Sequence, residues 1–425
     1  MRPEGYGPHR PHPLAEPATN GMSHRAPRQR LLEWSVILYV ASTIIEGAAF
    51  SLGEARVSRL IAVVLVLVVS GYAAKRKVPL FSNLALIGIF GVFILVAASS
   101  LWTQSAEQTS SRIVTFGGLA VTSVALAAAL ACLEQRGLKS IEYGLIIGAA
   151  VVSFLVIDSR IRGDFFAGPQ GLTIIFERST AGAADPNDLA LLLAVALPAC
   201  IWSARWQIRY LVAPATVFAI LFTGSRGAII SLLAGAVVAG FVTLLNHRQP
   251  FRRIIQSFAA AVIVIWTAWA FLPEALRERL QGIPTALDQG TFTNRTTLWR
   301  AAWEQSSENP FLGSGAGTAR ESIFQLTGIN QVIHNIHLSF LAELGIIGWL
   351  CFIFALAVAW VGAFRQSRFV AWPLVSIAIL TTGTWALSWE YNKLLWVMLI
   401  TGGALLSASY PTRSDIDKRE GGTNK

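Results

Sequence analysis

Apolar residues fill most of this chain in long runs, and short polar or basic connectors separate the runs. A helix needs about 20 apolar residues to cross a hydrocarbon core of roughly 30 Å, and the run LIAVVLVLVVSGYAA is typical of these segments. Such runs are too long for strands and too uniformly apolar for surface helices, and the alternation of a membrane barrel is absent. The pattern therefore predicts an all-α fold, a polytopic bundle of membrane helices.

Twelve segments of this kind are predicted to span a membrane, and together they form one bundle over residues 31–410. The predicted spans are residues 32–52, 57–74, 80–101, 112–132, 138–157, 187–203, 208–224, 227–245, 253–272, 335–361, 369–388 and 393–410. Residues 1–30, rich in Pro, His and Arg, are expected to form a disordered tail, and residues 411–425 form a second tail.

Basic residues set the orientation of this bundle, because Lys and Arg favour cytoplasmic connectors. With the N-terminus in the cytoplasm, 21 of the 34 Lys and Arg residues fall in inside segments, whose connectors are also short. We therefore expect both termini to be cytoplasmic. Only two outside segments, residues 158–186 and 273–334, are long enough to hold chemistry, and the second carries a predicted helix at 294–307.

The composition is typical of a membrane protein and limits the classes of binding partner that we expect. Hydrophobic residues make up 54% of the chain and charged residues 14%, with a mean hydropathy of +0.54, outside the range of soluble globular proteins. Positive inside connectors account for the net charge of +10, and membrane lipids are the expected partner of that charge. No nucleic-acid partner is expected.

Histidine is rare on the outer side. Of six histidines, only His334 and His337 fall there, at the start of a helix that reads HNIHLSFLAELG. Their spacing of three places them on one helix face, but no HExxH or similar pattern supplies a third metal ligand. A metal-free site is expected. A histidine at a helix start can also serve only as a cap, and this alternative stays open.

Three of the arginines in outer segments complete the candidate site: Arg178, Arg226 and Arg295. Arg226 lies in TGSRGAII, where free backbone N–H groups at a helix start and an adjacent guanidinium suit a phosphate. The alternative is an arginine that merely reaches the membrane interface.

Two further outer segments are expected to have structural roles. In DPNDLA, Asp185 and Asn187 are expected to form a turn and a helix cap. The glycine-rich stretch NPFLGSGAG lacks the Lys-Ser/Thr of a nucleotide-binding loop. It is expected to be a flexible hinge or to approach lipid headgroups.

Taken together, DPNDLA, TGSRGA, RxxxWxxA followed by NPFLGSGAG, and HNxxLxxLAELGxxG resemble the O-antigen ligase/polymerase family over about residues 178–350. The resemblance implies a bacterial inner-membrane protein with its active site in the periplasm. Such proteins transfer a glycan from undecaprenyl diphosphate to an acceptor, without a metal, nucleotide or other cofactor.

The resemblance also implies roles for particular residues. The essential histidine of the family corresponds to His334, which makes it the catalytic residue. Its arginine pattern indicates that Arg226, Arg295 and Arg178 bind the diphosphate. The supporting residues are expected to be Asn335, Asn187, Asp185 and His337.

Several functions stay open at this point. The first expectation is an O-antigen ligase that uses lipid A-core as acceptor, because one outer loop of about 60 residues dominates the other. A polymerase of O-antigen or exopolysaccharide, or a protein O-oligosaccharyl ligase, comes next. A secondary transporter with Glu46, Glu343 or Glu390 as intramembrane carboxylates is a distant alternative, disfavoured because the polar residues gather on one side.

Overall fold

The computed structural model describes residues 27–48, 51–52, 55–74, 82–166, 178–182, 185–245, 270, 272–282 and 295–407. The C-terminal tail lies outside these residues, as do most of the N-terminal tail and nearly all of the predicted span 253–272.

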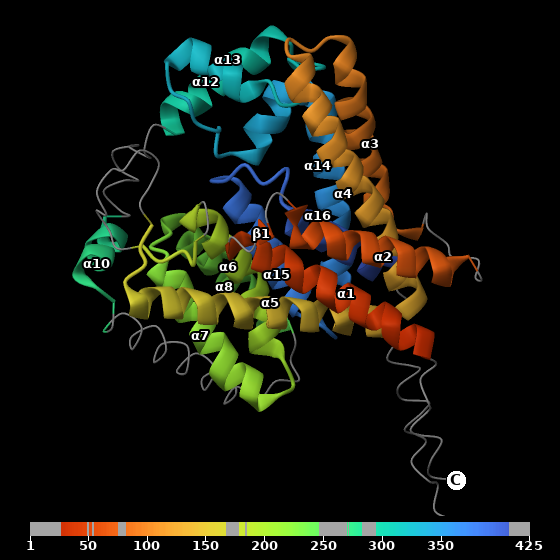
Figure 1. Cartoon of the computed structure of the whole chain (residues 1–425), viewed down its shortest axis with the longest axis vertical. Coiled ribbons are helices and arrows are strands. Elements are labelled where there is room, and N and C mark those ends of the chain that lie inside the picture. The colour runs from red at the N-terminus through yellow and green to blue at the C-terminus, as the bar shows by residue number, and fades with distance from the viewer. Residues whose placement is uncertain are drawn as a thin grey trace, which may run out of the picture.

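The described residues form a bundle of helices (Figure 1). The helices are α1 (Pro27–Ile45), α2 (Val57–Ala73), α3 (Ala85–Ala98), α4 (Ala106–Leu133), α5 (Gln135–Arg162), α6 (Pro186–Trp202), α7 (Ala213–Phe222), α8 (Arg226–Leu245), α10 (Glu274–Gln281), α12 (Arg295–Glu308), α13 (Ala319–Thr327), α14 (Ile336–Gln366), α15 (Trp372–Thr384) and α16 (Lys393–Ser407). Short helical turns lie at Glu46–Ala48, Ser99–Leu101 and, in π form, Ile208–Val212. Two strands, β1 (Ser51–Leu52) and β2 (Ala55–Arg56), pair antiparallel.

The helical fold class is confirmed, with this small hairpin as the exception. Among the described residues, five helices are long and apolar enough to cross a membrane, and six further apolar helices are shorter. These eleven helices fall within or overlap eleven of the twelve predicted spans. The first predicted span, residues 32–52, begins and ends too late, because α1 covers Pro27–Ile45, a helical turn follows at Glu46–Ala48 and β1 begins at Ser51. The number twelve stays a prediction.

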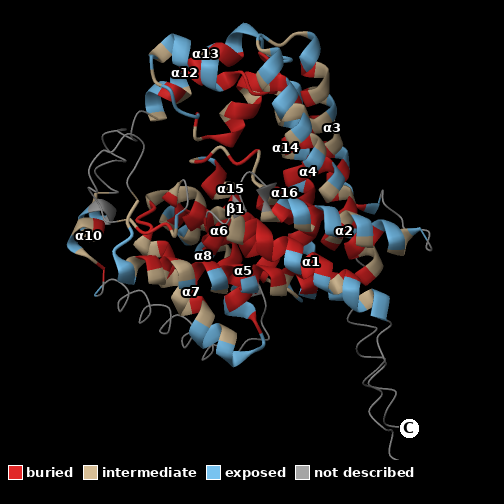
Figure 2. Ribbon diagram, in the orientation of Figure 1, coloured by how far each residue is buried: buried red, intermediate tan, exposed pale blue. Residues whose placement is uncertain are grey.

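Helices α6, α15 and α16 form the buried centre of the bundle (Figure 2). Helix α1 packs along α5, α14 packs against α3 and α16, and α15 packs against α6 and α8. Large apolar side chains on the outer helices are exposed, among them Leu67 on α2, Val114 on α4 and Val237 on α8. This arrangement suits a surrounding hydrocarbon solvent, since exposed aliphatic side chains are favourable in lipid.

Helices α12 and α13 lie together at one end of the molecule, beside the ends of α3 and α4 (Figure 1). They pack against α14 through a small apolar cluster of their own. We call this the site end. Helices α6, α8 and α14 begin near it, and the loop between α15 and α16, residues 385–392, contributes to it through the contacts described below.

The glycine-rich stretch is a packed joint, so the expectation of a hinge or a lipid-headgroup contact is wrong. The backbone N–H groups of Ser314 and Gly315 donate to the carbonyls of Ala342 and Glu343, both at 2.9 Å. Helix α14 kinks there, at Gly345 (φ 63°). A Cβ on Gly345 would lie 2.3 Å from the Phe311 backbone. Two glycine motifs far apart in the sequence therefore meet backbone to backbone.

Candidate functional site

The first part of the site is the start of α6, which holds Arg178 in place. Asp185 caps this helix, since its Oδ1 accepts from the backbone N of Asn187 at 2.7 Å and from Asn187 Nδ2 at 2.9 Å. The expected cap is thus confirmed. Asn187 does more than was expected of it, because its Oδ1 accepts from the Arg178 guanidinium at 2.9 Å.

Arg178 also reaches the turn that carries Arg226. Its Nε donates to the carbonyl of Thr223 at 2.6 Å. That turn continues through Gly224 (φ 61°) to Ser225, whose Oγ accepts from the backbone N of Ala228 at 3.3 Å. Helix α8 begins at Arg226, as the sequence predicts. Arg178 is therefore bonded to the backbone three residues before Arg226, in the turn that leads into α8.

Arg295 is the first residue of α12, and its charge interacts with two carboxylates at the start of α6. Burial lowers the pKa of its guanidinium, and the nearby carboxylates of Asp185 and Asp188 oppose that change. Asp188 in turn accepts a hydrogen bond from Trp389 Nε1 at 3.0 Å. The charges of Arg295, Asp185 and Asp188 therefore act on one another, although these residues come from two distant segments of the chain.

Sequence reasoning missed Asp188 and Trp389. The run DPND contains one more carboxylate than a helix cap requires, and this surplus was the available signal for Asp188. No sequence signal pointed to Trp389, because it lies in a short loop outside the motifs. Its hydrogen bond to Asp188 joins segments about 200 residues apart and is visible only in the fold.

His334 lies directly before α14, in a left-handed backbone conformation (φ 54°) that is unusual for a residue with a Cβ. Its neighbours hold it on both sides: Trp299 Nε1 donates to the Ile333 carbonyl at 3.0 Å. On the other side, Asn335 Oδ1 caps α14 by accepting from the backbone N of His337 and of Leu338. The helix cap is thus Asn335, and His334 is left for another role.

The electrostatic setting of His334 favours a neutral imidazole. Burial lowers its pKa, the positive charge of Arg295 lowers it further, and Asp185 partly opposes both. The side chain is half-buried, and among the described residues its ring nitrogens have no hydrogen-bond partner. A neutral imidazole with a free nitrogen can accept a proton, which is what a general base must do.

His337 has a different setting, although it lies one helical turn away. It is buried, its Nδ1 accepts from Trp349 Nε1 at 3.3 Å, and its ring lies 4.3 Å from the Trp385 ring and 5.9 Å from the Phe352 ring. These contacts make His337 part of an aromatic cluster. Within the described residues, no three His, Cys, Asp or Glu side chains gather in a way that could hold a metal ion, and independence from metal stays a prediction.

The loop 385–392 ties the site end together. Ser388 Oγ lies 3.3 Å from Ser339 Oγ on α14, and Trp389 bonds Asp188 on α6. Tyr391 donates to Glu343 Oε2 at 3.3 Å, and the Arg112 guanidinium lies 4.0 Å from the centre of the Tyr391 ring. One loop of eight residues thus contacts α4, α6 and α14.

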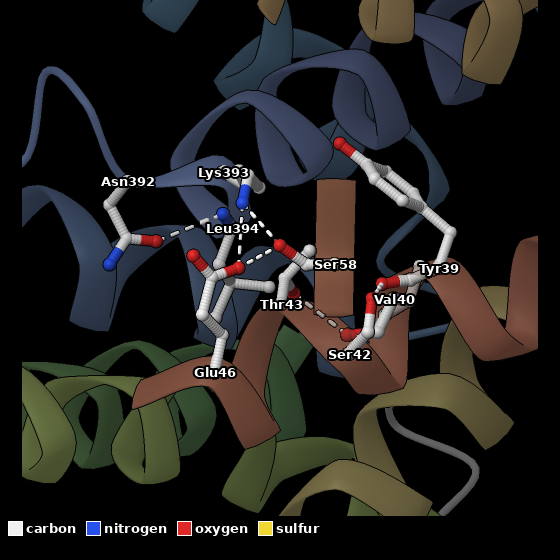
Figure 3. Close-up of polar contacts among 9 residues, drawn as sticks. All are labelled: Tyr39, Val40, Ser42, Thr43, Glu46, Ser58, Asn392, Lys393 and Leu394. Atoms are coloured by element: carbon white, nitrogen blue, oxygen red, sulfur yellow. Dashed lines mark hydrogen bonds and ion pairs between the residues drawn. The ribbon is translucent and has the colours of Figure 1, made fainter. Parts of the chain in front are cut away.

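Two of the three carboxylates considered for a transporter, Glu46 and Glu343, have local partners, whereas Glu390 Oε2 is buried with no hydrogen-bond partner among the described residues. Glu46 pairs with Lys393 at 2.6 Å, and Ser58 hydrogen-bonds to both (Figure 3). This group joins the end of α1 to the starts of α2 and α16. Glu343 accepts from Tyr391. These local contacts explain Glu46 and Glu343 without an ion pathway.

Residues 210–353 match the family model described as O-antigen ligase. No curated protein sequence matches the chain. The matched region holds Arg226, Arg295 and His334, whereas Arg178 and Asp185 precede it.

Proposed function

We propose that this chain, which carries an O-antigen ligase family domain at residues 210–353, is an inner-membrane glycosyltransferase with its active site in the periplasm. It transfers a glycan from undecaprenyl diphosphate to the hydroxyl of an acceptor, with lipid A-core as the favoured acceptor. The observation that carries the proposal is the linked set of side chains at the site end: Arg178 bonded into the Arg226 turn, and Arg295 acting on His334.

The arginines suit the leaving group. When the glycosidic bond to the diphosphate breaks, negative charge grows on the lipid diphosphate. A guanidinium binds phosphate oxygens through two parallel N–H groups. By analogy with donors in oxyanion holes, each key contact is worth about 3–4 kcal/mol of transition-state stabilisation. Because Arg178 is already hydrogen-bonded to Asn187 and Thr223, little reorganisation is needed when charge develops.

His334 suits the attacking group. The acceptor oxygen forms a bond to the anomeric carbon, the bond from that carbon to the diphosphate oxygen breaks, and the acceptor proton passes to the neutral imidazole. Base catalysis of this kind contributes about 10²–10⁴-fold in rate. Undecaprenyl diphosphate leaves as an anion, and a single displacement inverts the anomeric configuration. The diphosphate already activates the sugar, so the reaction needs no further cofactor.

A polymerase that adds glycan to a growing chain on the same lipid, or a protein O-oligosaccharyl ligase, uses the same chemistry with a different acceptor. The long outer segment, residues 273–334, favours a separate acceptor, because it is about twice as long as residues 158–186. It contributes Arg295 and His334 to the site, whereas the shorter one contributes Arg178.

The test is transfer by the purified chain in lipid nanodiscs. Donor is supplied as undecaprenyl diphosphate-linked repeat units, either alone or with lipid A-core. We expect glycan on lipid A-core in the second mixture and unchanged donor in the first. Growth of the glycan with donor alone identifies a polymerase, and no transfer in any mixture, including one with an acceptor protein, rejects the proposal.

A further inference from the structure

The ring of Trp385 is a feature that the proposed chemistry does not use. Trp385 follows the end of α15, and 56% of its surface is exposed. One side of this ring lies against His337, with 4.3 Å between ring centres and an interplanar angle of 37°. The contact fixes the indole, and the high exposure leaves part of it open to a ligand.

Three contacts bring the loop that carries Trp385 close to both parts of the proposed site. His337, which touches it, lies three residues after His334. Ala386, its neighbour, lies 3.7 Å from the position of a Cβ on Gly227, directly after Arg226. Trp389, four residues on, bonds Asp188, whose charge acts on Arg295. The loop that carries the indole thus contacts the start of α14, which follows His334, and the starts of α8 and α6, which carry or adjoin the arginines proposed to bind the diphosphate.

The part of a glycan donor expected beside Trp385 is the sugar ring attached to the diphosphate. If the diphosphate lies at the arginines and the anomeric carbon lies within reach of His334, the first sugar ring fills the space between them. Flat aromatic rings present a large apolar face at little conformational cost, and their faces carry partial negative charge. The C–H groups on one face of a pyranose are weakly positive and apolar, so they suit such a surface.

We propose that the exposed indole of Trp385, held by His337, is the platform for the sugar ring that is attached directly to the lipid diphosphate. This inference rests on the proposed function and adds a sugar subsite to it. It also gives the buried His337 a positioning role, since the imidazole backs the platform and does not touch the substrate.

The experiment measures binding to two probes: bare undecaprenyl diphosphate, and undecaprenyl diphosphate that bears the glycan, extracted from cells that make this chain. The wild type is expected to bind the glycan-bearing lipid more tightly. Trp385→Leu keeps an apolar side chain and removes the flat ring, so it should weaken that preference by roughly three- to tenfold and leave binding of the bare lipid unchanged. Trp385→Tyr should retain most of the preference.

The matched control is Trp206→Leu, because Trp206 is similarly exposed, at 64%, and lies in the connector between α6 and α7. Its substitution should change neither affinity. An unchanged preference in Trp385→Leu, or an equal loss for both probes, overturns the inference. Transfer activity of the wild type is measured beside binding. Its absence rejects the proposed function, whereas active wild type with an unaltered Trp385→Leu preference rejects the sugar subsite alone.

Discussion

The charges around His334 determine how the activity should depend on pH. Burial and Arg295 lower its pKa below the usual 6.5, and Asp185 partly opposes them. Activity should therefore be constant near neutral pH and fall as the pH drops through this lowered pKa, because the protonated imidazole cannot accept the acceptor proton.

Asp185→Asn tests this setting. Asparagine caps a helix as well as aspartate does, so the start of α6 should persist while the negative charge disappears. The carboxylate stabilises the imidazolium, so its loss should lower the pKa of His334 further and move the acid limb of the kcat/KM profile to lower pH. A limb that stays in place or moves to higher pH contradicts a charge interaction between Asp185 and the base.

Substitution of Arg226 distinguishes binding of the diphosphate from a side chain that only reaches the membrane interface. A lysine retains the charge but cannot reproduce the two parallel N–H groups of a guanidinium. We expect Arg226→Lys to lose about 10²-fold in kcat/KM, within the range for one lost oxyanion donor. Steady-state transfer at equal protein levels measures this loss. Activity close to that of the wild type shows that Arg226 only reaches the membrane interface.

At the scale of elements, the joint between the glycine-rich stretch and α14 makes a quantitative prediction. Gly345 has a positive φ of 63° and would place a Cβ 2.3 Å from the Phe311 backbone. Gly328 has a similar φ of 69°, but a Cβ there meets nothing within 4 Å. Gly328→Ala should cost about 1–2 kcal/mol from conformation alone. Gly345→Ala should cost several kcal/mol, because backbone must also move.

Thermal unfolding of the two variants in detergent, monitored by size exclusion, gives the comparison. Equal midpoints for Gly345→Ala and Gly328→Ala contradict the packed joint. Because His334 lies two residues before the start of α14, a disturbed joint should also reduce transfer activity more than Gly328→Ala does.

The elements that hold the site differ in how far the sequence predicts them. Apolar runs predict α6, α8 and α14 to within a few residues, and DPND and GSR identify the first turns of two of them because capping is local chemistry. The kink at Gly345 and the contact between Asp188 and Trp389 were not predictable in this way, although the surplus carboxylate in DPND marked Asp188 itself. They depend on contacts between segments far apart in the chain, and a one-dimensional pattern does not contain those contacts.

At the scale of the whole molecule, orientation in the membrane decides where the reaction occurs. We expect the site end to face the periplasm and both termini to face the cytoplasm. Gln325 on α13 and Gln207, in the connector between α6 and α7, are both exposed and belong to predicted opposite sides. In intact spheroplasts, a membrane-impermeant maleimide should label Gln325→Cys and should label Gln207→Cys only after lysis. The reverse pattern contradicts the orientation and the periplasmic reaction together.

The proposed mechanism depends most on His334, the group that takes up the proton of the acceptor hydroxyl. The most direct measurement is a single-turnover transfer assay in which wild type, His334→Ala and His337→Ala are saturated with lipid-linked donor and started with acceptor. His334→Ala should bind donor normally and transfer glycan at least about 10²-fold more slowly, whereas His337→Ala should lose far less. Transfer by His334→Ala at the wild-type rate, with equal amounts of folded protein, contradicts the mechanism.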